Sequence, residues 1–150
     1  MKEKILKIID KYGGDRGRLM DILIDVQALS DHIPEQAVAL LADQLDLSRV
    51  DVEEVISFYH FFSFEPIGKY AVYLNNSPVA CMHGRDAVAR AFEKEAGTTF
   101  NSVTADGLIG LWDTADIGMN DQEPAALING IPFTNLTASR VKELVAGFRE

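Results

Sequence analysis

The spacing of apolar residues changes at residues 63–69, SFEPIGK, and this change divides the chain into two parts. Before it, apolar residues recur every three or four positions, which is the period of an α-helix. From Tyr70 onward they follow the alternation of a β-strand. Pro66 and Gly68 interrupt regular structure between the two. We therefore expect an N-terminal helical bundle over residues 1–66 and an α/β domain over residues 67–150.

Four amphipathic helices are predicted in the first part. The first covers about residues 3–12, and the second covers about residues 19–29. Pro34 is expected as the first residue of the third helix, a position that suits a residue without a backbone N–H. Ser48, followed three residues later by Asp51, resembles a capping signal for the fourth.

The second part is predicted to form a short mixed sheet covered by helices. A strand begins near Tyr70, a helix ends at Gly97, and LIGLWDT (108–114) indicates a second strand. In AALINGIPFTN (125–135), the Asn-Gly pair suits a type I′ hairpin turn. Thr137 then caps a last helix. Strands and helices in this order describe an α/β layer fold.

The charge balance and the cysteine count limit the function. Excess acid, 23 Asp and Glu against 14 Lys and Arg for a net charge of −9, argues against binding to nucleic acid or to an anionic membrane. No apolar run approaches the ~20 residues that span a bilayer. The single cysteine, Cys81, cannot form a disulfide within the chain, and one thiol is too few for a cysteine-ligated zinc site. A reducing, cytoplasmic location is expected.

Two stretches resemble the thioredoxin-like 2Fe-2S ferredoxin family, which includes the 24 kDa or E-type subunits of complex I and of NAD-linked hydrogenases and formate dehydrogenases. The stretch LMDILIDVQ…EPIGKY (19–70) resembles the family's helical N-terminal part. The stretch GLWDTADIGMNDQEPAALINGIPFTNLT (110–137) resembles its distal cluster loop and the strand and hairpin that follow. The resemblance covers about residues 17–148 and implies a thioredoxin-like fold for the α/β domain.

The same resemblance implies where a 2Fe-2S cluster would be bound. In the family, two pairs of cysteines hold it, and the pairs fall here on Asn76 with Cys81 and on Asp116 with Asn120. Three of the four thiolates are therefore absent. Iron–sulfur clusters depend on anionic sulfur donors, and neutral amides are very poor substitutes. We expect a degenerate site with no cofactor of its own.

Two other chemistries have candidate residues in these segments. A calcium loop that starts at Asp113 would need a bidentate glutamate where Pro124 stands, so a solvated or capping acidic loop is the favoured interpretation. Cys81 and His83 could form a nucleophile and its base, but no third orienting group is evident and the segment is predicted to be a loop. A thiol without a chemical role is favoured there.

An aromatic run, SFYHFFSF (57–64), is too dense for one side of a helix to bury. One interpretation places Phe58 and Phe62, four residues apart, in a core junction between the helical and α/β parts. The other places some rings at a partner interface, because aromatic anchors dominate the binding energy of interfaces. The interface candidates are Phe61, Phe62 and Phe64, and both interpretations stay open for different rings.

The resemblance implies a non-catalytic accessory subunit of a multisubunit NAD(P)-linked flavoprotein oxidoreductase, such as a hydrogenase, a formate dehydrogenase or a complex I-like diaphorase module. It would dock on the flavin- and NAD(P)-binding subunit, with further iron–sulfur subunits in the complex. The alternative is an electron-transfer subunit that keeps a 2Fe-2S cluster through atypical ligands, for instance ligands from a partner or Cys81 from two copies. A thiol–disulfide enzyme is disfavoured, since no resolving cysteine is present.

Overall fold

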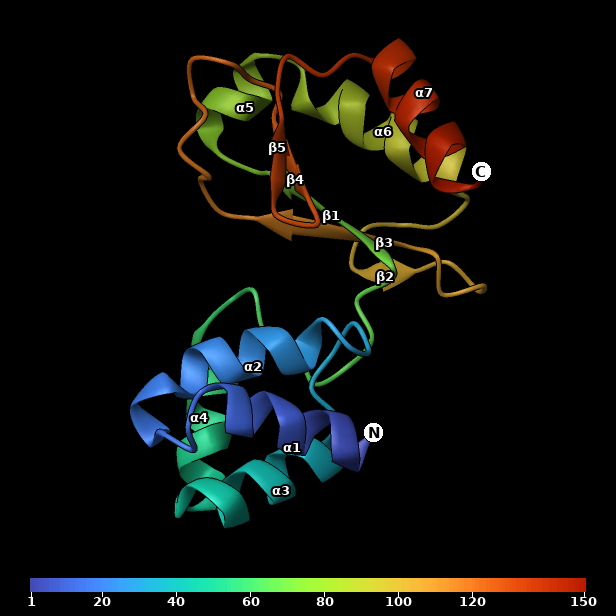
Figure 1. Ribbon diagram of the computed structural model, residues 1–150. Helices are drawn as coiled ribbons and strands as arrows, with labels where there is room; N and C mark the ends of the chain where they lie inside the picture. Colours follow the sequence, from blue (N-terminus) through green and yellow to red (C-terminus); the bar gives the residue numbers. More distant parts are fainter. The chain divides into compact units, whose positions relative to one another are not determined.

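The helices of the N-terminal part form where apolar residues recur at helical spacing. The computed structural model describes residues 1–150 and divides them into two units, Met1–Pro66 and Ile67–Glu150. The first unit contains α1 (Lys2–Lys11), the 3-10 helix η1 (Arg16–Arg18), α2 (Leu19–Gln27), α3 (Glu35–Leu45) and α4 (Arg49–Phe58) (Figure 1). The four predicted α-helices are confirmed, with ends displaced by one to two residues for the first two.

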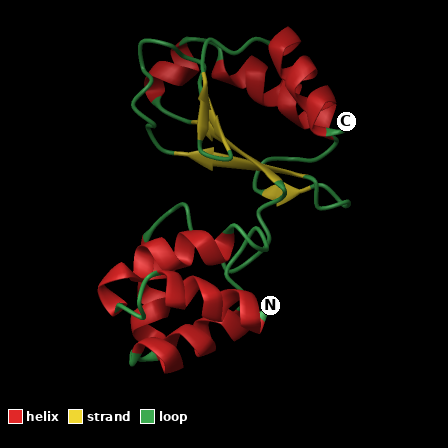
Figure 2. Ribbon diagram, in the orientation of Figure 1, coloured by secondary structure: helices red, strands yellow, loops and turns green.

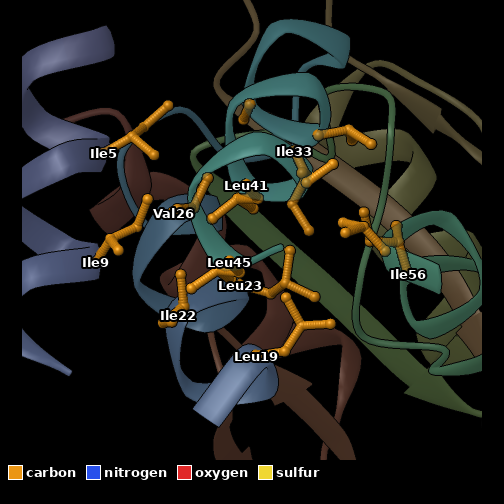
Figure 3. Close-up of a cluster of buried hydrophobic side chains, with 14 of the residues drawn as sticks. Ile5, Ile9, Leu19, Ile22, Leu23, Val26, Ile33, Leu41, Leu45 and Ile56 are labelled. Atoms are coloured by element: carbon orange, nitrogen blue, oxygen red, sulfur yellow. The ribbon is translucent and has the colours of Figure 1, made fainter. Parts of the chain in front are cut away.

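One apolar core holds the helical unit together. Figure 3 shows side chains from different helices converging, among them Ile5 from α1, Ile22 from α2 and Leu41 from α3. Ile22 and Leu41 are completely buried. Burying a side chain of this size contributes about 1.5–3 kcal/mol, so a core assembled from all four helices provides most of the unit's stability.

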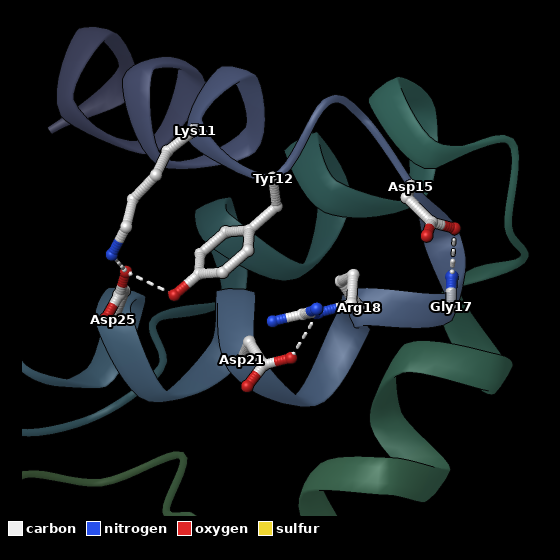
Figure 4. Close-up of polar contacts among 7 residues, drawn as sticks. All are labelled: Lys11, Tyr12, Asp15, Gly17, Arg18, Asp21 and Asp25. Atoms are coloured by element: carbon white, nitrogen blue, oxygen red, sulfur yellow. Dashed lines mark hydrogen bonds and ion pairs between the residues drawn. The ribbon is translucent and has the colours of Figure 1, made fainter.

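Polar contacts on the surface add to this core. Lys11 Nζ and the Tyr12 hydroxyl both donate to Asp25 Oδ2, at 2.7 and 3.0 Å, and so link the end of α1 to α2 (Figure 4). The hydrogen bond from Lys11 holds the pKa of Asp25 below its usual value. Because these groups face water, the contacts align the two helices more than they stabilise them.

The ends of α3 and α4 follow from their capping residues. Ser48 and Asp51 form a capping box, in which each side chain accepts a hydrogen bond from the other residue's backbone N–H, as predicted. Pro34 is the N-cap of α3, so the expectation that it is the first helical residue was wrong. Its backbone is extended, with ψ at 151°, and the helix begins at Glu35.

The second unit contains a mixed five-stranded sheet in the order β2-β3-β1-β4-β5. Its central strands, β1 (Tyr70–Asn75) and β3 (Ile109–Thr114), are parallel, and Tyr70 pairs with Ile109. The three other strands are short: β2 (Ser102–Val103), β4 (Ala126–Ile128) and β5 (Ile131–Phe133). β2 pairs antiparallel with β3, β4 pairs antiparallel with β1, and β5 pairs antiparallel with β4. The predicted α/β fold with a short mixed sheet is confirmed.

Helices cover one face of this sheet (Figure 2). They are α6 (Arg85–Ala96) and α7 (Ala138–Phe148), while the short helix α5 (Pro78–Met82) follows the end of β1 and lies beside α6. Phe92 of α6 and Val141 of α7 are fully buried in one core with Leu111 of β3. No helix in the structure is long and apolar enough to cross a membrane.

The hairpin between β4 and β5 turns at the predicted Asn-Gly pair. Asn129 and Gly130 have φ values of 49° and 79°, which a type I′ turn requires at both of its central positions. The Asn129 side chain also accepts from the Ala71 backbone N–H at 2.9 Å and donates to the Lys69 carbonyl at 3.0 Å. The turn residue is thus fixed to the beginning of β1.

Candidate functional site

The residues at the four predicted cluster positions lie in two segments beside the ends of β1 and β3, and we call these segments, 76–82 and 115–122, the cradle. The two strands are parallel and end in register, with Asn75 opposite Thr114. One residue further on, the Asn76 backbone N–H donates to the Thr114 carbonyl at 2.9 Å. Loops that follow neighbouring parallel strands emerge at one edge of a sheet, where binding sites of α/β proteins commonly lie.

The first segment of the cradle turns directly into α5. Ser77 caps this helix by accepting from the Ala80 backbone N–H at 3.1 Å, and Pro78 is its first residue. Cys81 therefore stands on a helix and is exposed, so the prediction of a loop around it was wrong. The Ser-Pro pair is the signal that could have identified this short helix from sequence.

Cys81 and His83 do not act on each other. The Cys81 Sγ lies 3.9 Å from Asn76 Oδ1, whereas the His83 Nδ1 is 2.9 Å from the Val79 carbonyl of its own helix. The imidazole is oriented by the backbone rather than toward the thiol. This geometry offers no activated nucleophile.

The second segment of the cradle is organised by Asp116. Its Oδ1 accepts from the Gly118 backbone N–H at 2.7 Å, and its Oδ2 accepts from Asn120 Nδ2 at 2.7 Å. Both bonds hold the pKa of Asp116 below its usual value of 3.8, and the bond from Asn120 has the larger effect. The carboxylate is therefore charged at neutral pH and occupied by donors of its own loop.

One side-chain hydrogen bond joins the two segments of the cradle. The Ser77 hydroxyl donates to Asn120 Oδ1 at 3.3 Å. The structure thus brings all four predicted positions into two neighbouring segments, as two contacting pairs: Asn76 with Cys81, and Asp116 with Asn120.

Beneath the cradle lies a buried polar pair that sequence reasoning did not single out. Asn75 is completely buried, and its Nδ2 donates to Oε1 of the buried Glu123. The second oxygen of Glu123 accepts from the Ala125 backbone N–H at 2.8 Å, and the Ala125 carbonyl accepts from the Asn75 N–H at 2.9 Å. The Glu123–Pro124 peptide bond is cis. This pair fixes the chain just after the cradle to the end of β1.

Asp113, the first position of the candidate calcium loop, is engaged by an arginine. Arg85, whose side chain is only 12% exposed, pairs with Asp113 Oδ1. Its guanidinium also lies over the Phe100 ring, 5.4 Å from the centroid. The carboxylate therefore faces a protein cation rather than a metal. The structure contains no group of three or more Asp, Glu, His or Cys side chains that could hold a metal ion.

The donor atoms of the cradle do not match a cluster held by four thiolates. They are one thiol, one carboxylate and two amides. The amide of Asn120 and the carboxylate of Asp116 are hydrogen-bonded to each other. Iron in these clusters is bound by anionic sulfur, which only Cys81 could provide. The side chains are suited to hydrogen bonding rather than to binding iron.

The aromatic run separates into buried and exposed rings. Phe62 is 7% exposed and belongs to the core of the helical unit, so we do not retain it as an interface residue. Phe58 is 80% exposed, so of the two open interpretations the one that places it in a core is wrong; α4 ends there with the ring directed to solvent. Phe61 and Phe64 are 46% and 41% exposed. An open hollow of ≈ 550 Å³ adjoins Phe58 and Tyr59.

The fold and the cradle define the class of protein. The chain matches the thioredoxin-like 2Fe-2S ferredoxin family over residues 5–149, and it belongs to that family. It is 43% identical over 150 residues to the NAD-reducing hydrogenase HoxS subunit alpha of Cupriavidus necator. All of this chain is covered, but it spans only 25% of that relative's length.

Other relatives are of similar length to this chain. The NADP-reducing hydrogenase subunit HndA of Solidesulfovibrio fructosivorans is 24% identical over 97% of this chain and 85% of its own. An NADH-quinone oxidoreductase subunit from Escherichia coli is 26% identical over 99% of this chain and 89% of its own. An NAD+-reducing NiFe-hydrogenase, solved in its air-oxidised state, superposes with a TM-score of 0.76 at 29% identity, covering 88% of this chain and 23% of the solved chain.

Proposed function

We propose that this chain is a non-catalytic accessory subunit of a multisubunit NAD(P)-linked flavoprotein oxidoreductase, and that it docks on the flavin- and NAD(P)-binding subunit without a cluster of its own. One observation carries the proposal. The family fold is kept, while three of the four cluster positions hold amide or carboxylate side chains, two of which bond to each other. A chain that keeps the family fold without the cysteine ligands of the cluster can still bind a partner protein through its surface.

The relatives support a partner of this kind. In the C. necator hydrogenase subunit, the region similar to this chain is one quarter of a longer polypeptide. That region is therefore covalently joined to the other three quarters of subunit alpha of an NAD-reducing hydrogenase. We propose an equivalent pairing here, in a cytoplasmic complex that contains further iron–sulfur subunits.

The exposed rings of Phe58, Phe61 and Phe64 are the proposed contact with that subunit, and we call them the aromatic surface. Large exposed rings are effective anchors, because each removes much apolar area from water in a single pocket. Glu54 beside Phe58 and Glu65 beside Phe64 give the surface an acidic border. The matching site on the partner is an apolar pocket bordered by Lys or Arg side chains.

Purification from native extracts tests this function. The chain is expected to elute at the size of a complex, together with flavin absorbance and NAD(P)H-dependent dye reduction. Replacing Phe58 and Phe61 by Ser should separate the chain from the flavin, whereas Val50→Ser, which changes an apolar residue that is 60% exposed, should not. A monodisperse, flavin-free monomer in native extract would refute the proposal.

The electron-transfer alternative has one observation in its favour: the Cys81 thiol is exposed and within reach of another chain. The visible spectrum and the iron and acid-labile sulfide content of the anaerobically purified complex, each compared with those of the Cys81→Ala complex, separate the two functions, because the other iron–sulfur subunits contribute equally to both. Stoichiometric iron with visible charge-transfer bands that disappear in Cys81→Ala would establish the alternative. An unchanged spectrum in Cys81→Ala, with the chain itself free of iron, is expected.

A further inference from the structure

The two segments of the cradle need something to hold them together. Outside the sheet, residues 115–122 form no regular strand or helix, and keeping such a loop in one conformation costs conformational entropy at every residue. A metal cluster bound by both segments would offset this cost by linking them. Because the side chains at the four positions do not fit a cluster, another linkage between the two segments has to offset this entropy cost.

Asn120 has the chemistry for such a linkage. Its amide is a donor and an acceptor at once. The Nδ2 donates within its own segment, to Asp116 Oδ2 at 2.7 Å, and the Oδ1 accepts across the gap, from Ser77 at 3.3 Å. A cysteine at this position could make neither contact well, because a thiol is a weak donor and a weak acceptor. The residue is therefore poor for iron and good for bridging the two segments.

Both ends of this arrangement are attached to the fold. Ser77 is buried and also caps α5, so its hydroxyl is fixed in position. At the other end, Asp116 accepts from the Gly118 backbone N–H and thereby closes a turn in which Gly118 has a φ of 79°. The hydrogen bonds thus run without interruption from the beginning of a helix to the backbone of the opposite loop.

We propose that Ser77, Asn120, Asp116 and the Gly118 backbone form a polar clasp, which cross-links the two segments of the cradle in place of a metal cluster. This inference rests on the proposed absence of a cluster. The clasp maintains the conformation of the two segments of the cradle without a cluster that could transfer electrons.

Amide hydrogen exchange on the full 150-residue chain tests the clasp. Asn120→Ala removes both contacts of the amide, and we expect exchange to become about five- to tenfold faster at residues 116–121 and also at residues 80–83, which are the last residues of α5 and its C-cap His83. The effect on α5 is diagnostic, because only a linkage between the segments transmits it. Faster exchange at 116–121 alone would overturn the proposal and reduce Asn120 to a local turn residue.

Asp106→Ala is the matched control. Like Asp116, Asp106 is an exposed aspartate in a turn. It accepts hydrogen bonds from Thr104 Oγ1 and from the Leu108 backbone N–H. Its hydrogen bonds stay within its own loop, and its electrostatic partner outside that loop is Arg149 rather than a residue of the cradle. We therefore expect faster exchange at residues 104–109 and no change in α5. Loosening of α5 in this control would show that the effect of Asn120→Ala is not specific, and would likewise overturn the clasp.

A second variant keeps the test decisive if Asn120→Ala does not fold. Asn120→Cys restores the side chain that the resemblance implies for this position but removes the amide. In the presence of a reductant, we expect the same loosening of α5. Full protection of α5 in folded Asn120→Cys would overturn the clasp. Iron and sulfide measured on the unmodified chain test the cluster-free function separately, since that measurement does not depend on how the two segments are linked.

Discussion

The helical unit and the cradle of the α/β unit are ordered by different forces. The helical unit buries apolar side chains from all four of its helices in one core. The cradle depends on single polar contacts, such as Asp116 with Asn120 and Asn75 with Glu123. An apolar core spreads its free energy over many contacts, whereas a polar contact disappears when either partner is removed. The core therefore sets the stability of a unit, and the polar contacts set the shape of the cradle.

The largest effect is expected in the apolar cores. Leu41→Ala in the helical unit leaves a cavity at a fully buried position and should lower the free energy of unfolding by about 2–5 kcal/mol. Phe92→Ala should cost about 3–5 kcal/mol in the α/β unit for the same reason. Denaturant titration followed by circular dichroism measures both.

Phe58→Ala is the control for these core variants. Its ring is large but 80% exposed, so we expect little change in the free energy of unfolding. A loss comparable to that of Leu41→Ala would contradict the description of Phe58 as a surface residue and weaken its place in the aromatic surface.

An intermediate effect is expected for the buried pair beneath the cradle. Glu123→Ala leaves the Asn75 amide and the Ala125 N–H without their acceptors in a buried place, at a cost of about 1–3 kcal/mol. Asn75→Ala breaks the same contact, so the double variant should lose less than the sum of the two single variants. Strictly additive losses in denaturant titration would show that the two side chains do not stabilise each other.

A smaller effect is expected for the capping box of α4. Ser48→Ala removes the acceptor of the Asp51 N–H and should cost about 1 kcal/mol in thermal or denaturant unfolding. Ser48→Thr keeps a hydroxyl that accepts from the Asp51 N–H and donates to Asp51 Oδ2, and it serves as the control, with most of the stability retained. Equal losses in the two variants would mean that the cap hydrogen bond is not what Ser48 contributes.

Most of the fold could be predicted from sequence, because its signals are local. Helical spacing identified the four helices of the first unit, and the Asn129–Gly130 pair identified the hairpin turn. The missed elements are short: α5 has five residues, η1 has three and β2 has two, and none is long enough to show a periodicity. Pro34 was misplaced by one position, since its fixed φ suits both a helix and the extended residue before one.

The candidate site could be predicted only in part, because its contacts join distant residues. The resemblance located Asn76, Cys81, Asp116 and Asn120, and the structure gathers them. The pairing of Asn75 with Glu123, 48 residues apart, has no local signal. The aromatic run shows the same limit: spacing alone could not decide that Phe62 enters the core while Phe58 stays in solvent, because both depend on where α4 ends.

The smallest effect concerns the pH dependence of the cradle. The folded structure holds the pKa of Asp116 below its usual value of 3.8, mainly through the Asn120 amide. A carboxyl group with a lowered folded pKa stabilises the fold above its unfolded pKa, and this contribution is lost as the pH falls through the folded value. We therefore expect the Gly118 amide, followed by NMR, to keep its bonded chemical shift as the pH falls through 3.8 and to lose it only at more acidic pH. In Asp116→Asn the side chain cannot titrate, so the acid-induced change at Gly118 should disappear while that of Leu108, which depends on Asp106, remains. A Gly118 shift with the same acid dependence in Asp116→Asn would show that another group controls this loop, and that the polar order of the cradle does not depend on the charge of Asp116.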